Sequence, residues 1–209
     1  MEGNESPRRI FYHGSSVQGI RLLKPFSKSH NTIKKPVVYL TPNETLALFY
    51  IWEREYKFVT FDEDERGAVV YTEWYENQFD DLTRGLSGSV YACLDDPRIY
   101  ATHVKGVFNS DEPVPVLSET VIDDVQGEIR KRIADGRVVL RPYRTLDEEE
   151  KEKIKDNVVR AIHLQHLLTA GESAYKTFLQ ERFPVSWNIA ANMSAPEIKA
   201  MIDEWRRAN

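Results

Sequence analysis

The chain is poor in several features that define whole classes of protein. Cys93 is its single cysteine, so an internal disulfide framework and any zinc site built on several thiolates are excluded. No apolar run is long enough to span a bilayer, and residues 1–9 are polar and charged, without the apolar core of a signal peptide. These absences predict a cytoplasmic protein with no membrane partner.

The chain also has fewer basic than acidic residues. The 209 residues include 28 lysines and arginines against 33 acidic residues, which gives a formal net charge of −5. This balance provides no overall positive field to hold nucleic acid, so only a local basic patch could do so. The sequence has neither a Rossmann glycine fingerprint nor a phosphate-binding P-loop, and it gives no support for a conventional nucleotide-binding fold.

What the sequence does contain predicts an α+β protein. Hydrophobic residues make up 41% of the chain, enough to bury a core at this length. Up to about residue 142 the chain consists of short β-branched and aromatic runs, and beyond it the signals are those of helices. We therefore predict a β-rich domain over residues 8–142 and a helical extension over residues 143–209. The predicted strands cover residues 10–12, 37–40, 57–61, 68–74, 89–94, 102–107, 114–117, 120–122 and 137–140.

Helix-start signals follow one of these strands and recur later in the chain. Thr41, Pro42 and Glu44 fit the N-cap, N1 and N3 positions, which predicts a helix over residues 42–54 directly after a buried strand. Two further capping boxes begin at Thr145 and Ser194. The later helices are predicted over residues 123–134, 145–169, 173–183 and 194–207.

The residues best suited to chemistry lie around two strands. His13, Gly14 and Ser15 follow a short apolar strand and offer a side-chain donor beside a backbone that a ligand can approach closely. Tyr39 ends the next buried strand, and Tyr50 lies eleven residues further on, on the helix that this strand feeds. Two tyrosines so placed can hold a flat ring between them, and a heteroaromatic amide such as nicotinamide would fit.

This ordered set resembles the ADP-ribosyltransferase fold of the diphtheria-toxin and poly(ADP-ribose) polymerase type. That family carries a histidine, tyrosine and glutamate signature, and its first strand bears His-Gly-Ser or His-Gly-Thr, similar to residues 13–15. The spacing of Tyr39 and Tyr50 is similar to that of the polymerase branch. Tyr-His-Gly-Ser with Val-Tyr-Leu-Thr-Pro is similar to bacterial and phage proteins of this clan. The resemblance covers about residues 10–125 and implies a split β-sheet core.

The resemblance also implies an NAD⁺ site and a transferase reaction. Nicotinamide leaves through an oxocarbenium-like transition state, and a macromolecular acceptor, protein or nucleic acid, or water then attacks. A glutamate stabilises the developing cation, and our candidate is Glu119, just before a β-branched run. By the same resemblance, His13 binds the adenine-side ribose, Gly14 and Ser15 hold the carboxamide, and Tyr39 and Tyr50 flank the ring.

Other charged residues accompany this set. Glu112 and Glu73 also lie beside predicted strands and are alternatives to Glu119. Residues 19–35 would correspond to the loop that covers the donor, where basic side chains can meet the NAD⁺ pyrophosphate. Those basic side chains are Arg21, Lys24, Lys28 and His30.

Structural interpretations of the same residues stay open. His13 can be a turn histidine, and Glu119 can be a solvated strand residue or an ion-pair partner. The two tyrosines can simply pack in a core. A domain of this fold can also be inactive and serve as an interaction module, with the C-terminal helices contacting a partner protein. RNA 2′-phosphotransferase uses the same fold and donor, but it would need a basic surface facing RNA.

No metal is implied by the sequence. His163 and His166 stand three residues apart on a predicted helix, but no carboxylate–histidine motif accompanies them, so a helix-surface or interface role is favoured. Cys93 lies in an apolar strand without a local basic partner. It is therefore expected to be a small buried hydrophobic residue, not a nucleophile.

Overall fold

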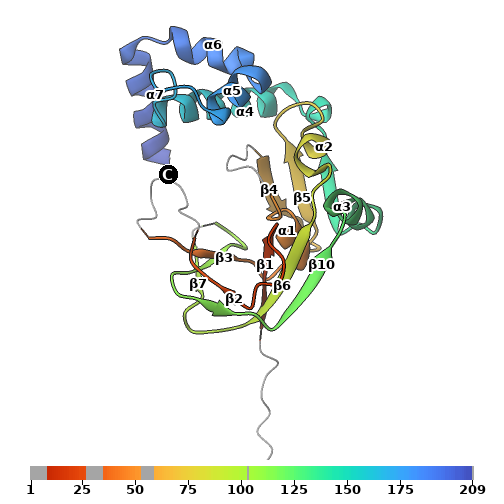
Figure 1. Ribbon diagram of the computed structural model, residues 1–209. Helices are drawn as coiled ribbons and strands as arrows, with labels where there is room; N and C mark the ends of the chain where they lie inside the picture. Colours follow the sequence, from red (N-terminus) through yellow and green to blue (C-terminus); the bar gives the residue numbers. More distant parts are fainter. Residues whose placement is uncertain (1–8, 27–34, 53–58, 103, 209) are drawn as a thin grey trace, which may run out of the picture. The chain divides into compact units, whose positions relative to one another are not determined.

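The protein mixes helices with small antiparallel sheets, as the α+β prediction requires (Figure 1). The computed structural model describes residues 9–26, 35–52, 59–102 and 104–208. The chain divides into two compact units. The first comprises residues 1–55, 61–71 and 79–140, and the second comprises residues 56–60, 72–78 and 141–209.

Two three-stranded sheets form most of the first unit. One has the order β1-β6-β10, with β1 (Ile10–Ser15) and β10 (Ser118–Ile122) both antiparallel to the central β6 (Gly88–Leu94). The other has the order β3-β8-β7, formed by β3 (Val38–Leu40), β8 (Phe108–Ser110) and β7 (Tyr100–Ala101). An isolated backbone bridge between Tyr12 of β1 and Thr41, just after β3, joins the two sheets.

Two further sheets and three helices lie between residues 9 and 141. A two-stranded sheet joins β2 (Leu22–Leu23) to β9 (Val114–Pro115). A further sheet has the order β11-β5-β4. Its strands are β11 (Val138–Arg141), β5 (Val69–Glu73) and β4 (Val59–Glu63), and the helices are α1 (Glu44–Leu48), α2 (Gln78–Thr83) and α3 (Val125–Ala134).

The core of the first unit lies on one face of β1 and β6. Phe11 lies opposite Cys93 in the strand register, and both side chains are buried. The Phe11 ring packs on Phe108 of β8 with centroids 4.8 Å apart. The remaining buried members of this cluster are Leu23, Val38, Leu40, Tyr91 and Val114.

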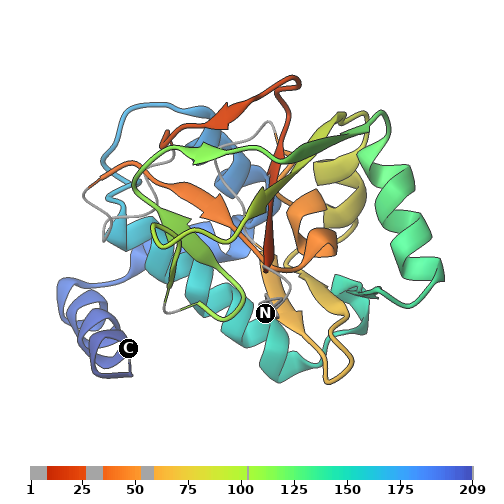
Figure 2. The ribbon, with the colours of Figure 1, turned by 90° about the horizontal axis from the view of Figure 1, so that it is seen from below.

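Helix α1 packs on the other face of β1, and Gly14 makes this possible (Figure 2). A Cβ added to Gly14 would lie 2.0 Å from the backbone oxygen of Ala47 in α1. No side chain can occupy that space, so glycine at this position lets the helix backbone lie directly against the strand.

The predicted helix over residues 42–54 is too long and begins at the wrong cap. Asn43 is the N-cap, and its side-chain oxygen accepts from the amides of Thr45 and Leu46. Thr41 does not cap, because its carbonyl, which an N-cap offers to the first turn of the helix, accepts from the Tyr12 amide instead. After Leu48 the chain turns by i→i−3 hydrogen bonds, so Tyr50 lies in a turn. The last two residues of the predicted helix lie outside the described residues.

The predicted strand at 102–107 is also wrong. The amide of Thr102 donates to the carbonyl of Val107 and that of Val107 to the carbonyl of Val104, which makes this segment the turn of the β7–β8 hairpin. Gly106 has φ of +76°, a conformation that glycine adopts without strain. The sequence analysis also missed the short elements β2 and α2, which are too brief for a periodic pattern.

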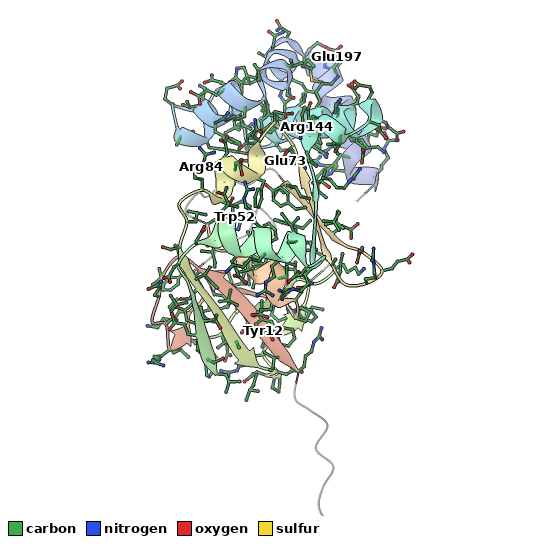
Figure 3. The ribbon with its side chains drawn as sticks, turned by 90° about the vertical axis from the view of Figure 1, so that its right-hand side faces the viewer. Tyr12, Trp52, Glu73, Arg84, Arg144 and Glu197 are labelled. Atoms are coloured by element: carbon green, nitrogen blue, oxygen red, sulfur yellow. The ribbon has the colours of Figure 1, made fainter. Side chains whose placement is uncertain are left out.

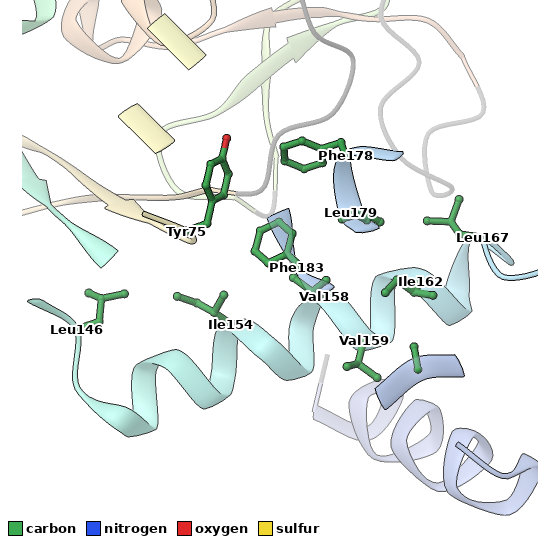
Figure 4. Packing of buried hydrophobic residues seen from close by; sticks show 11 residues of the cluster. Tyr75, Leu146, Ile154, Val158, Val159, Ile162, Leu167, Phe178, Leu179 and Phe183 are labelled. Atoms are coloured by element: carbon green, nitrogen blue, oxygen red, sulfur yellow. The ribbon is translucent and has the colours of Figure 1, made fainter. Parts of the chain in front are cut away.

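The second unit is mainly helical. Its longer helices are α4 (Glu148–Leu164), α5 (Ala174–Arg182), α6 (Pro184–Asn192) and α7 (Ala195–Ala208), preceded by a 3₁₀ turn at Tyr143–Thr145. Figure 4 shows its core, in which Ile154, Val158 and Ile162 line one side of α4. The rings of Phe178 and Phe183 lie 5.9 Å apart in the same cluster.

Three details of this unit differ from the sequence prediction. Helix α4 ends at Leu164, before the predicted end at residue 169. The N-cap of α4 is Asp147, which forms a reciprocal capping box with Glu150, whereas Thr145 belongs to the preceding 3₁₀ turn. Helix α6 was not predicted. It follows α5 directly, and a proline such as Pro184 is typical both of the first turn of a helix and of the residues just after a helix ends. Helices α3, α5 and α7 match their predicted segments, and Glu197 accepts from Ser194 as the last capping box requires.

Candidate functional site

The candidate site lies where β1 and β3 part. The amide of Tyr12 donates to the carbonyl of Thr41 at 2.7 Å, and the amide of Thr41 donates back at 3.0 Å (Tyr12 is labelled in Figure 3). Beyond this bridge the two strands belong to different sheets. Had their pairing continued in the same register, Gly14 would lie opposite Tyr39.

The backbone N–H and C=O of Gly14 point toward the side on which β3 separates from β1. Along a strand, the backbone groups of alternate residues point to the same side. Because Tyr12 directs its N–H and C=O toward Thr41, those of Gly14 also point away from β6. Of the described strands, none pairs with β1 on that side beyond Tyr12. Gly14 therefore presents a donor and an acceptor of the spacing that a primary amide requires.

Strand register places His13 and Glu119 in one row. His13 lies opposite Tyr91 in the β1–β6 pair, and Glu119 lies opposite the same Tyr91 in the β10–β6 pair. Directly opposed residues project to the same face of an antiparallel sheet. The first and last of the sequence-predicted residues, far apart in the chain, therefore lie two strands apart on one face.

Glu119 is held by several donors through a single oxygen. Its Oε1 accepts from the Gly19 amide at 2.9 Å and from the Ser89 hydroxyl at 2.7 Å. The Tyr91 hydroxyl lies 3.0 Å from the same oxygen and 2.7 Å from the Val17 carbonyl, and its one proton can serve either. Among the described residues, none donates to Oε2.

These donors keep Glu119 charged. The Gly19 amide, followed by the Ser89 hydroxyl, lowers the pKa of Glu119 below its usual value, and the charge of Arg21 adds to this. At neutral pH the side chain is therefore a carboxylate with one oxygen tethered and the other able to accept. Such a group can stabilise a neighbouring cation.

His13 joins this row to β3. Its Nδ1 lies 2.8 Å from the backbone carbonyl of Tyr39. A carbonyl can only accept, so Nδ1 carries the proton in this hydrogen bond, and Nε2 is the acceptor nitrogen of the neutral ring. This hydrogen bond fixes the orientation of the imidazole. It also links β1 to β3 at the point where the two strands begin to separate.

Tyr39 and Tyr50 lie close enough to influence one another. Burial, with a smaller contribution from Tyr39, raises the pKa of Tyr50 to about 12. The pKa of Tyr39 is raised by burial and by the neighbouring Tyr100. Tyr39 and Tyr50 are therefore neutral phenols at physiological pH, and with Tyr100 they form a group of tyrosines beside the backbone of β3.

The remaining predicted residues are Ser15 and the basic residues that follow it in the chain. Ser15 lies opposite Ser89 and accepts a hydrogen bond from the Val17 amide at 3.1 Å, at the start of the β1–β2 loop. Of the basic residues predicted to meet the pyrophosphate, Arg21 before β2 and Lys24 after it are exposed, and Lys28 and His30 lie outside the described residues.

The two alternatives to Glu119 have other partners. Glu112 is exposed and lies 3.8 Å from Arg98 in an ion pair. Glu73 is buried in the second unit, where it accepts from the Tyr143 amide (Figure 3). Glu119 is thus the candidate that strand register places in the row of His13.

The sequence analysis missed the groups that connect the predicted residues. Tyr91 and Ser89 are fully buried on β6, between the two strands that carry His13 and Glu119. The only sequence signal was polar atoms at alternate positions of an otherwise apolar strand. Gly19 was noted only as the start of a loop, yet its amide is the first cause of the lowered pKa of Glu119.

A surface pocket of about 440 Å³ lies elsewhere on the first unit. Its described lining includes Tyr12, Asn43, Glu63 and Arg132, and it includes none of the six predicted residues. The guanidinium of Arg132 is already paired with Glu128, at 3.2 Å, and lies 3.8 Å from Glu44. Because its charges are internally neutralised, this pocket is not our candidate site.

Cys93 and His166 were also singled out in the sequence. Burial raises the pKa of the Cys93 thiol to about 12, so it is a buried, unreactive thiol. His166 lies past the end of α4, with φ of +54°. Among the described residues, no three His, Cys, Asp or Glu side chains gather as a metal site, and no helix is long and apolar enough to cross a membrane.

Comparison with protein-family models, with curated proteins and with solved structures found no match to this chain.

Proposed function

We propose that this chain is an NAD⁺-dependent ADP-ribosyltransferase that moves ADP-ribose to a macromolecular acceptor, or to water, and releases nicotinamide. The observation that carries the proposal is the placement of His13 and Glu119 opposite the same residue, Tyr91. This row lies beside the parting of β1 and β3, which is consistent with the split sheet expected from the resemblance.

In the proposed reaction, the bond between the nicotinamide nitrogen and ribose C1′ breaks, and its electron pair leaves with nicotinamide. The acceptor then forms a bond to C1′ and loses a proton. Glu119 suits the charge that develops on the ribose, because its carboxylate is ionised and Oε1 is fixed by the Gly19 amide. Oε2 is the oxygen that would accept from a ribose hydroxyl.

The other residues would bind and orient the donor. Nε2 of His13 accepts from a hydroxyl of the second ribose, since Nδ1 is committed to Tyr39. The Gly14 N–H and C=O receive the carbonyl and the amino group of the carboxamide. Tyr39 and Tyr50 lie against the ring, where neutral phenols add stacking without a charge.

NAD⁺ binding tests this proposal directly. We expect NAD⁺ to raise the midpoint of thermal unfolding of the wild-type chain in a concentration-dependent manner, because a ligand that binds only the folded state stabilises it. Tyr12→Phe is a matched control, since Tyr12 projects to the opposite face of β1 from His13 and should leave the shift unchanged. No shift at millimolar NAD⁺ in a folded wild-type sample would contradict the proposal.

One observation favours a second candidate, a catalytically inactive domain of the same fold that serves as an interaction module. Glu119 Oε1 anchors the loop that follows β1, through the Gly19 amide, and this is a structural role that needs no catalysis. In that case the helices of the second unit would contact a partner protein. Normal NAD⁺ binding without nicotinamide release in the presence of diverse acceptors would favour this candidate.

A further inference from the structure

Asn109 occupies the middle of the tyrosine group. It lies on β8, opposite Tyr39 of β3 on one side and opposite Tyr100 of β7 on the other. Side chains of directly opposed residues share a face, so the amide of Asn109 projects between two phenols. The alternating residues Leu40 and Phe108 project the other way, into the hydrophobic core.

The Asn109 side chain is buried and incompletely satisfied. Only 2% of the residue is exposed, although it lies on the face of β8 away from the hydrophobic core. Its Oδ1 accepts no hydrogen bond from the part of the chain that the structure describes. A buried acceptor without a donor is rare and lowers the stability of the folded state. An apolar residue of similar size would avoid this cost, which indicates that the amide serves a ligand.

The surroundings restrict the ligand's chemistry. Tyr39 and Tyr100 on either side present flat rings, and Tyr50 lies near Tyr39. A flat aromatic molecule fits beside such rings. To satisfy Oδ1 it must also bring a hydrogen-bond donor. The combination describes an aromatic ring that carries an N–H group.

We infer that Asn109 Oδ1 accepts a hydrogen bond from the carboxamide N–H of the nicotinamide ring and makes the site selective for the amide over the corresponding acid. The inference rests on the proposed function and names a specificity residue for it. A primary amide has two N–H donors, and the Gly14 carbonyl takes one. In a site from which water is excluded, the second needs another acceptor, and Asn109 provides it. A nicotinic acid ring has no N–H donor and would bring a carboxylate oxygen against Oδ1.

The test compares NAD⁺ with its nicotinic acid analogue on the full-length chain. Dissociation constants are measured by calorimetry for the wild type, Asn109→Leu and Asn109→Asp. We expect the wild type to prefer NAD⁺. Asn109→Leu should bind NAD⁺ about tenfold more weakly and lose the preference, because one hydrogen bond is removed. Its ligand-free form should unfold at a higher temperature than the wild type, since the unsatisfied acceptor is gone.

Asn109→Asp provides the second variant. Its carboxyl group keeps an acceptor oxygen for the amide N–H and, where ionised, repels the acid. Because burial raises a carboxyl pKa, binding is compared over a range of pH, and the preference for NAD⁺ should widen as the pH rises. This variant decides the matter if the leucine variant does not fold. An unchanged preference in the folded variants would overturn the role of Asn109 while the proposed function stands. A wild type that binds neither dinucleotide would overturn the proposed function and, with it, this inference.

Discussion

The Nδ1 atom of His13 lies 2.8 Å from the backbone carbonyl of Tyr39, at the point where their strands separate. This hydrogen bond joins the two parts of the candidate site. It ties the row of His13, Tyr91 and Glu119 to the tyrosines beside β3. The two nitrogens of the ring then differ in role: Nδ1 donates to Tyr39, and Nε2 is the nitrogen that the proposed function assigns to the ribose.

His13→Asn separates those two tasks. An asparagine amide can replace the Nδ1 donor to Tyr39, but it has no counterpart of Nε2. We expect the variant to unfold at nearly the wild-type temperature and to bind NAD⁺ about 3- to 10-fold more weakly, the effect of one neutral hydrogen bond. His13→Ala should lose stability as well. Wild-type affinity in a folded His13→Asn protein would show that the histidine is only structural.

Ser89→Ala tests the electrostatics of Glu119. The Ser89 hydroxyl donates to Oε1 at 2.7 Å and lowers the pKa of Glu119, so its removal should raise that pKa toward the ordinary value. A lowered carboxyl pKa adds stability above the unfolded value and loses it as pH falls through the folded value. In the variant, the stability that Glu119 contributes should therefore be lost at a higher pH than in the wild type. NMR titration of the Glu119 side chain measures the change, and an unchanged pKa would contradict the assignment.

The close approach of α1 to Gly14 predicts that a side chain at this position lowers the stability of the fold. Gly14→Ala places a Cβ 2.0 Å from the Ala47 oxygen, so either β1 or α1 must move. We expect a loss of about 1–3 kcal/mol or more in the free energy of unfolding, the usual cost of overpacking. A larger side chain at this position, such as valine, would unfold the site before it could report on ligand binding.

The control for Gly14 is Gly171→Ala in the other unit. Apart from its chain neighbours, no heavy atom of the residues that the structure describes lies within 4 Å of the added Cβ there. Denaturant unfolding of both variants should show a clear loss for the first and little change for the second. Equal midpoints for Gly14→Ala and the wild type would mean that α1 does not lie against β1 as described.

His163 predicts a pH dependence in the second unit. Burial lowers the pKa of its ring below 6.5, and its Nε2 is buried without a hydrogen-bond partner among the described residues. As pH falls below 6.5, the unfolded chain takes up the proton first, so stability decreases down to the lowered folded value. Urea midpoints at pH 7.5 and 5.5 should differ more for the wild type than for His163→Gln. The same difference in both proteins would refute the role of this histidine.

The sequence predicted the elements better than their junctions. The strands that carry His13, Tyr39 and Glu119 were indicated by apolar runs, and the later helices by their caps. The predicted runs 10–12 and 120–122 stop short of His13 and Glu119, which the structure places within β1 and β10. The α1 cap was misplaced because Thr41 and Asn43 are both good caps, and only the bridge to Tyr12 decides between them. That bridge joins distant segments and leaves no local pattern.

In the candidate site, too, the sequence indicated single residues but not how they are connected. Residue types and order indicated His13, Tyr50 and Glu119, but their connection depends on strand register. Tyr91 lies between His13 and Glu119, and Asn109 lies between two tyrosines, only because of which strands are neighbours. Sequence periodicity gives the face of a residue within its own strand and says nothing of the strand alongside.

The most direct measurement is nicotinamide release from NAD⁺ by the wild-type chain and by Glu119→Gln. Glutamine keeps an oxygen to accept from Gly19 and Ser89, so the variant should unfold at nearly the wild-type temperature while it loses the negative charge. We predict release by the wild type and a decrease of about 100- to 1,000-fold in the variant, as expected when a group that stabilises transition-state charge is removed. Equal release by both proteins, or none from a folded wild type, would contradict the account.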